Sequence, residues 1–153
     1  NKSTYTTGKG WGVQNFQNVI DRINYNWVQV GSNVDGNGKI NNEIALKNCI
    51  NLKGKTNLRE LLYLVYKSNF VFCNEGYLNH ISSAFDKKCF IVMSGFTSTE
   101  HVKYKNSIFI TKTPQIHCAP CHITGDCPKE RKYCTEDIQV DKVVNSIIDK
   151  FDV

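Results

Sequence analysis

The sequence predicts an α/β fold, a Rossmann-like parallel sheet with helices on both faces. Segments of strand type alternate with segments of helix type along the 153 residues. Two strand segments, residues 70–73 and 89–93, are continuously apolar, as expected for strands that helices cover on both faces. The first of them stops at a polar, glycine-containing turn, residues 74–80, in which a helical pattern begins. Such a turn presents free backbone N–H groups to an anion, and ligands of open α/β sheets bind at this end of the strands.

The remaining elements follow from hydrophobic periodicity. The predicted strands are short and end at glycine or polar residues; they are residues 27–30, 51–52, 70–73, 89–93 and 107–111. The predicted helices carry apolar residues at helical spacing and lie at residues 16–23, 40–47, 58–65, 78–86 and 140–148. Thr56 or Asn57 caps the third helix, and Glu60 completes a capping box if Asn57 is the cap. Between the first strand and the second helix lies a loop rich in glycine and asparagine, residues 31–38.

The length and composition fit one domain that spans residues 1–153, with 41% hydrophobic residues to build its core. No run of 18 apolar residues is present, so no segment is expected to span a membrane. The net charge of +5 is mild and the lysines are scattered, so the sequence shows only a weak nucleic-acid footprint. The same balance also suits an anionic small molecule such as a nucleotide, and charge alone does not choose between them. The chain begins at Asn1 without a methionine or a signal-peptide pattern, so we expect a piece of a longer protein.

The seven cysteines form two groups. Cys49, Cys73 and Cys89 lie in or beside apolar runs, and we expect buried thiols there. The other four crowd into a loop at residues 117–135; they are Cys118, Cys121, Cys127 and Cys134. Free buried thiols and the lack of a secretory signal favour a cytoplasmic protein.

Three interpretations of the cysteine-rich loop remain open. Four thiolates this close can hold a structural zinc or iron, with His117 and His122 as substitute ligands. One or two disulfides, or free thiols, are the alternatives. In each case the role is structural, because no acid–base residues that would suit a catalytic metal are evident nearby.

Two glycine-containing loops carry lysines. Lys9 lies between two glycines just before the first helix, where its ammonium can neutralise phosphate; the alternative is an ordinary solvated loop lysine. The run Gly54-Lys55-Thr56 follows a strand and precedes a helix, as a phosphate-binding loop does. That motif needs a glycine five residues earlier, where Cys49 stands, so a turn and a helix cap are the better interpretation.

Several of these features occur together and in the same order in one known family. The first shared runs are Lys9-Gly10-Trp11 before a helix and residues 51–61, which contain Gly-Lys-Thr and Glu-Leu. Residues 74–80 follow in the form Asn-Glu-Gly-x-Leu-x-His, and then the strand and loop at residues 89–95. The last shared run is the Cys-x-Pro-Cys element with two later cysteines. On these residues the chain resembles the C-terminal domain of glycosyltransferase family 9, the lipopolysaccharide heptosyltransferases and their relatives.

The resemblance implies the donor-binding half of a GT-B fold, with the N-terminal acceptor domain absent from this chain. It implies an inverting transfer of a sugar, typically heptose from ADP-heptose, to a saccharide or lipid-linked acceptor such as lipopolysaccharide core. No cofactor is required for that catalysis. The missing domain would bind the acceptor, and the full-length protein would be cytoplasmic or peripheral at the inner face of the membrane.

The resemblance also assigns roles to individual residues. Lys9 would stabilise the departing diphosphate, and Glu75 would lie near the donor sugar. Backbone N–H groups of Gly76, Tyr77 and Leu78 would bind the diphosphate, with His80 at the family's histidine position. Two departures from the family pattern affect the choice of donor. Tyr77 stands where the family has a small residue. The family's acidic residue in the loop after the second strand has no clear match here, and Asp35 is only a loose candidate for a ribose contact.

A second hypothesis comes from a different class of protein. Four cysteines on one metal can organise a structural or nucleic-acid-binding module. The α/β alternation outside the cysteine-rich loop argues against it, because a module held together by a metal has no need of that alternation.

Overall fold

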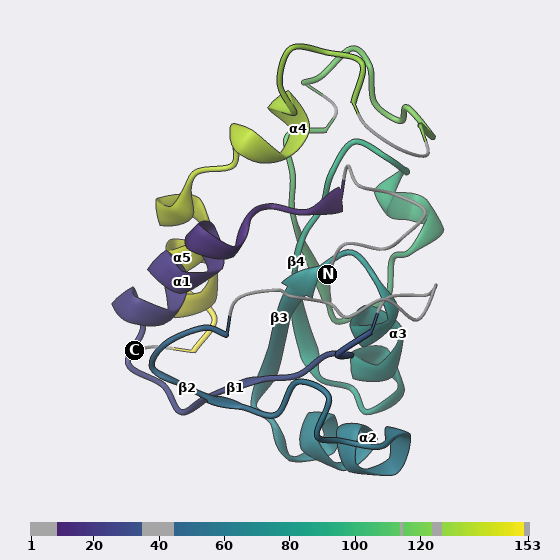
Figure 1. Cartoon of the computed structure of the whole chain (residues 1–153). Coiled ribbons are helices and arrows are strands. Elements are labelled where there is room, and N and C mark those ends of the chain that lie inside the picture. Colours follow the sequence, from purple (N-terminus) through teal and green to yellow (C-terminus); the bar gives the residue numbers. More distant parts are fainter. Residues whose placement is uncertain (1–8, 35–44, 114, 124–126, 152–153) are drawn as a thin grey trace.

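The computed structural model describes residues 9–34, 45–113, 115–123 and 127–151 (Figure 1). In chain order, its elements are α1 (Val13–Arg22), β1 (Trp27–Gln29), β2 (Cys49–Asn51), α2 (Leu58–Lys67), β3 (Phe70–Asn74), α3 (Tyr77–Ala84), β4 (Lys88–Val92), the short 3-10 helix η2 (Thr99–His101), β5 (Ser107–Ile110), α4 (Tyr133–Glu136) and α5 (Val140–Ile148).

All strand pairs are parallel, as predicted. β4 lies between β3 and β5, with Phe70 opposite Lys88 and Cys89 opposite Ser107. β1 and β2 form a separate two-stranded sheet. The prediction of one continuous sheet is therefore met only in part. Where β1 approaches β3, the contact is made by aromatic side chains: the Trp27 ring lies edge-on to Phe70, with ring centres 5.5 Å apart.

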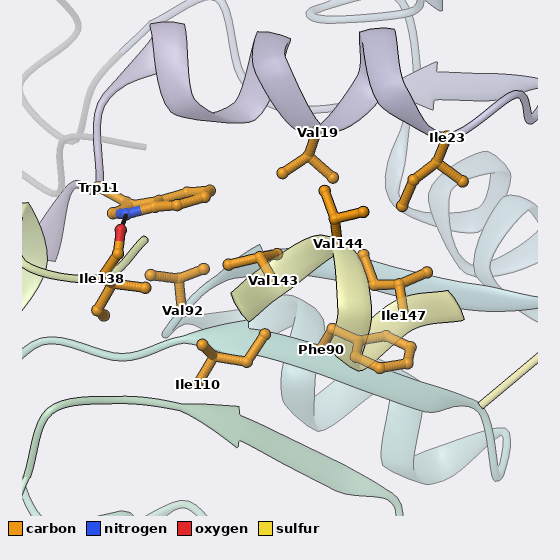
Figure 2. Close-up of a cluster of buried hydrophobic side chains, with 10 residues drawn as sticks. All are labelled: Trp11, Val19, Ile23, Phe90, Val92, Ile110, Ile138, Val143, Val144 and Ile147. Atoms are coloured by element: carbon orange, nitrogen blue, oxygen red, sulfur yellow. Dashed lines mark hydrogen bonds between the residues drawn. The ribbon is translucent and has the colours of Figure 1, made fainter. Parts of the chain in front are cut away.

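Helices cover both faces of the three-stranded sheet, so the alternating residues of β4 enter two different cores. One core contains Phe90 and Val92 from β4 and packs beneath α1 and α5 (Figure 2). The other contains Cys89, Ile91 and Met93 and packs against α2 and α3. Four of the five residues of β4 are buried, which explains the continuous apolar run in the sequence.

Helix α2 begins at the predicted capping box. The Asn57 side chain accepts a hydrogen bond from the Glu60 N–H at 3.0 Å, and the Glu60 carboxylate accepts one from the Asn57 N–H at 2.8 Å. Both bonds satisfy backbone donors that have no partner inside the helix. The cap confirms that Asn57, not Thr56, precedes the first helical residue.

The predicted helix at residues 40–47 is not confirmed. Residues 40–44 and Asp35 lie outside the described residues, and residues 45–47 are not helical. Side chains from elsewhere bind the backbone there: the N–H of Leu46 donates to Gln29 Oε1 at 3.0 Å, and that of Lys47 donates to Gln17 Oε1 at 2.7 Å. These long-range bonds take the place of a helical hydrogen-bond pattern.

The expectation of buried thiols is confirmed for Cys73 and Cys89, whereas Cys49 is only partly buried. Cys49 lies on β2, and within the described residues β2 pairs with β1 alone. Helices η2 and α4 were not predicted, since neither is long enough to show a periodic pattern. Across the described segments, no helix combines the length and the apolar character needed to cross a membrane.

Candidate functional site

Three loops meet beyond the carboxyl ends of β3 and β4. They are the segment before α1, the turn after β3 and the loop after β4. The first is fixed by Trp11, whose indole is 3% exposed and donates a hydrogen bond from Nε1 to the Ile138 carbonyl oxygen at 3.0 Å (Figure 2). The backbone N–H of Trp11 also donates a hydrogen bond to Asn74 Oδ1 at 3.4 Å. This bond joins the segment before α1 to the end of β3. Lys9 is thereby held close to the turn that follows β3.

Lys9 and Glu75 form an ion pair at this junction. Their side chains are 17% and 11% exposed, so the pair is largely shielded from water. The Lys9 ammonium also lies over the Phe96 ring, 4.7 Å from its centre. The alternative interpretation of Lys9 as a solvated loop lysine is wrong, because a carboxylate and an aromatic ring enclose its charge.

Helix α3 begins beside this ion pair. Its N-cap is Gly76, which offers no side-chain oxygen to the first turn. The N–H groups of a first helical turn have no helical acceptors, so those of Tyr77 and Leu78 lie at the positive end of the helix. The Leu78 side chain packs into the core beneath α3, which leaves its backbone as the part that a ligand can reach.

Tyr77 is 41% exposed and lines a neighbouring cavity. Burial raises the pKa of its phenol, and the nearby Cys73 adds to the effect. The hydroxyl therefore stays neutral to a higher pH than that of a free tyrosine.

His80 lies apart from the ion pair. It is exposed on α3, and its Nδ1 hydrogen-bonds to the Tyr104 hydroxyl at 2.7 Å. Among the described residues, no hydrogen bond or ion pair joins His80 to Lys9 or Glu75. The structure thus brings together Lys9, Glu75 and the start of α3, with His80 bonded to the loop that precedes β5.

A cavity of about 460 Å³ lies beside Tyr77. The loops that follow β1 and β2 line it, together with Leu58 and Leu61 of α2. The two loops are joined by a hydrogen bond from the Gly54 N–H to the Gly31 carbonyl oxygen at 2.7 Å. This cavity was not predicted from the sequence. Its one indication in the sequence was Gly54, in the run that we interpreted as a turn and a helix cap.

Gly54 is required where it stands for two reasons. Its φ is +66°, a backbone conformation that favours glycine. A Cβ atom there would also lie 2.0 Å from the Asn33 side chain. The close approach of Asn33 to the Gly54 backbone therefore shapes one wall of the cavity.

The four cysteines of the loop at residues 117–135 line one small apolar cavity of about 60 Å³, beside Gly95 and Phe96. Burial raises the pKa of the Cys134 thiol, and the other three thiols raise it further. All four are free thiols, and in the described part of the chain no three His, Cys, Asp or Glu side chains are grouped as metal ligands. His117 and His122, the substitute ligands, are not among the lining residues.

These features define a class of protein, a parallel α/β domain. A lysine, a carboxylate and a helix N-terminus lie together at the carboxyl ends of its strands, where an anionic ligand can bind. The model of one family, glycosyltransferase family 9 (heptosyltransferase), matches residues 1–131, and the chain belongs to that family. No curated protein and no solved structure gives a significant match.

Family membership makes the protein a glycosyltransferase, an enzyme that takes a nucleotide-sugar donor and a saccharide acceptor. It gives no support to the alternative of a structural or nucleic-acid-binding module organised by four cysteines.

Proposed function

We propose that this chain is the donor-binding domain of an inverting glycosyltransferase and forms the C-terminal half of a GT-B fold. In this proposal the enzyme transfers heptose from an ADP-sugar. The observation that carries the proposal is the shielded Lys9–Glu75 pair beside the start of α3. Together they place a cation, a carboxylate and free N–H groups within one small region of the sheet edge.

The proposed chemistry follows from where charge develops. Breaking the bond between the sugar and the diphosphate builds negative charge on the leaving phosphate. Lys9 and the N–H groups of Gly76, Tyr77 and Leu78 are preorganised donors for that charge, so this domain needs no metal for the step. Glu75 has a carboxylate that accepts hydrogen bonds from sugar hydroxyls when Lys9 turns to the phosphates.

The nucleoside of the donor occupies the cavity between Tyr77 and Gly54 in this proposal. Its volume of about 460 Å³ falls within the range of small-molecule sites, which is roughly 300–1,000 Å³. Its walls combine the apolar Leu58 and Leu61 with the amides of Asn33 and Asn57, a lining that suits a flat base with polar edges. His80, one helical turn from Tyr77, has no direct contact with the diphosphate in this arrangement.

The acceptor would bind a second domain, which supplies the base that deprotonates its hydroxyl. A saccharide such as lipopolysaccharide core is the proposed acceptor. The full-length protein would work in the cytoplasm or at the inner face of the membrane, where lipid-linked acceptors are available.

For the cysteine-rich loop we propose a structural zinc or iron held by Cys118, Cys121, Cys127 and Cys134. The support is that all four thiols line one apolar cavity. Within the described residues no three of them are grouped as metal ligands, so they would have to close around the metal, which would also remove their protons. Elemental analysis of the purified protein tests this. One equivalent of zinc or iron is expected, and a metal-free protein with four titratable thiols or with disulfides would overturn it.

Calorimetry with ADP on the intact protein tests the proposed function. Lys9→Ala should weaken ADP binding about 10- to 100-fold, since hydrogen bonds to charged groups contribute about 1.5–3 kcal/mol. Lys105→Ala, an exposed loop lysine, is the matched control and should leave the affinity unchanged. Equal affinities of the Lys9 variant and the wild type would remove Lys9 from the site.

Thermal unfolding separates the proposed function from its alternative. ADP should raise the melting temperature of the intact protein because it binds only the folded state. Single-stranded RNA should leave it unchanged. Stabilisation by RNA but not by ADP would reverse the proposal.

A further inference from the structure

We infer that Phe96 is a positioning residue for Lys9 and that the cysteine-rich loop holds Phe96 in place. This inference rests on the proposed function of Lys9 as the cation that meets the donor diphosphate. It assigns a role in donor binding to a loop that otherwise has only a structural one.

The contact between Lys9 and Phe96 lies within the range of a cation–π interaction. The ammonium is 4.7 Å from the ring centre, and the attraction acts out to about 6 Å. Glu75 forms an ion pair with the same ammonium. Once a donor sugar engages Glu75, the ring of Phe96 still attracts the ammonium and keeps it aimed at the diphosphate.

The loop that carries Phe96 is bonded to the cysteine-rich loop through its backbone. The Cys121 N–H donates to the Gly95 carbonyl oxygen at 2.9 Å, and the His122 N–H donates to the Phe96 carbonyl oxygen at 3.0 Å. The His122 ring also packs edge-on to the Phe96 ring, with centres 6.0 Å apart. Phe96 therefore contacts both Lys9 and the cysteine-rich loop.

Gly95 makes this close approach of the two loops feasible. A Cβ atom at Gly95 would lie 3.0 Å from Ala119 Cβ and 3.3 Å from Cys134 Cβ, which is closer than ordinary packing permits. Gly95, Phe96 and all four cysteines line the same small cavity. A change in the packing of the cysteine-rich loop is thus transmitted to Phe96 and, through its ring, to Lys9.

Calorimetry on the intact protein with inorganic pyrophosphate and with ADP tests the role of Phe96. Phe96→Leu should weaken the binding of both ligands about 2- to 30-fold, because a partly desolvated cation–π contact contributes about 0.5–2 kcal/mol. Phe96→Tyr keeps the ring face and should restore the affinity. In a Lys9→Ala background, Phe96→Leu should have no further effect, since the residue that it positions is gone.

Two results would overturn the role of Phe96. One is an unchanged affinity in Phe96→Leu, and the other is the same loss of affinity with and without Lys9. If Lys9→Ala alone leaves ADP binding unchanged, the proposed function fails first. A loss in Lys9→Ala without any loss in Phe96→Leu contradicts only this inference.

Two variants test the support from the cysteine-rich loop. Gly95→Ala should push the two loops apart, and His122→Ala removes the ring that backs Phe96 while leaving Gly95 as it is. Each should weaken pyrophosphate binding at least 2-fold, without any contact to the ligand. Wild-type affinity in both variants, when Phe96→Leu is impaired, would show that Phe96 stays in place without this loop.

Discussion

Lys9 and Glu75 form an ion pair at the carboxyl edge of β3, although 66 positions separate them in the chain. Both side chains are largely buried, so the pair is screened by water less than a surface pair would be. A buried charge needs a partner, and each member of this pair supplies the partner of the other. In the proposed function, binding of a diphosphate would exchange one anion for another around Lys9.

This exchange predicts the effect of Glu75→Gln. The change removes the anion that competes for Lys9 and repels phosphate, so pyrophosphate should bind about 3- to 10-fold more tightly at low salt. Transfer from the complete donor should fall, because the sugar loses a carboxylate acceptor. Calorimetry and a transfer assay measure the two effects, and Glu130→Gln, an exposed glutamate, is the control. Weaker pyrophosphate binding would instead mean that Glu75 serves mainly to hold Lys9 in place.

Gly54→Ala should destabilise the protein by about 1–3 kcal/mol, because alanine is strained at positive φ and its Cβ meets Asn33. Adding Asn33→Gly should restore the stability that is lost through the clash with Asn33. The loss that comes from the strained backbone at position 54 should remain. Gly10→Ala is the matched control, since a Cβ there meets no atom within 4 Å. Denaturant unfolding measures all three. An equal loss in the single and double variants would show that contact with Asn33 contributes nothing.

Trp11→Phe should cost about 1–3 kcal/mol of stability, because the buried Ile138 carbonyl oxygen loses the indole N–H as its donor. It should also weaken ADP binding, since Trp11 anchors the segment that carries Lys9. Thermal unfolding and calorimetry follow the two effects separately. Wild-type stability in this variant would mean that water replaces the indole N–H at Ile138.

Tyr77 gives the site a dependence on alkaline pH. Burial raises the pKa of its phenol, so the neutral form contributes stability that is complete below about pH 10, the usual pKa of tyrosine, and is lost as pH rises through the raised value. Tyr77→Phe should therefore lose less free energy of unfolding than the wild type does as the pH rises above about 10. Tyr63→Phe, at an exposed position on α2, serves as the control. Parallel pH profiles for the wild type and Tyr77→Phe would contradict the expected burial.

Local sequence patterns were sufficient for most of the elements. The capping box of Asn57 and Glu60 spans three positions, and the apolar spacing of α1, α2 and α5 reports one buried face of each helix. The turn after β3 was equally visible, because a strand ends and a helix begins within a few residues. Residues 45–47 were mispredicted because Gln17 and Gln29, far away in sequence, hold their backbone.

The candidate site could be predicted only in part. Lys9, Glu75 and the start of α3 were predicted as site residues from their positions in loops at the edge of a parallel sheet and from the family resemblance, and the structure brings them close together. Phe96 and the cavity beside Gly54 were missed, because each depends on which loops the strand order brings together. His80 was expected near the ligand, but its position on the helix surface directs it to Tyr104.

The sequence by itself thus determined the longer helices, most of each strand, the capping box and the turn from Asn74 to His80, since these depend on residues only a few positions apart. Only the tertiary structure decided that Glu75 pairs with Lys9, that Phe96 lies against the same ammonium and that the cysteine-rich loop packs behind Phe96. Those contacts join segments tens of residues apart, and the packing of helices and loops around β3 and β4 brings them together.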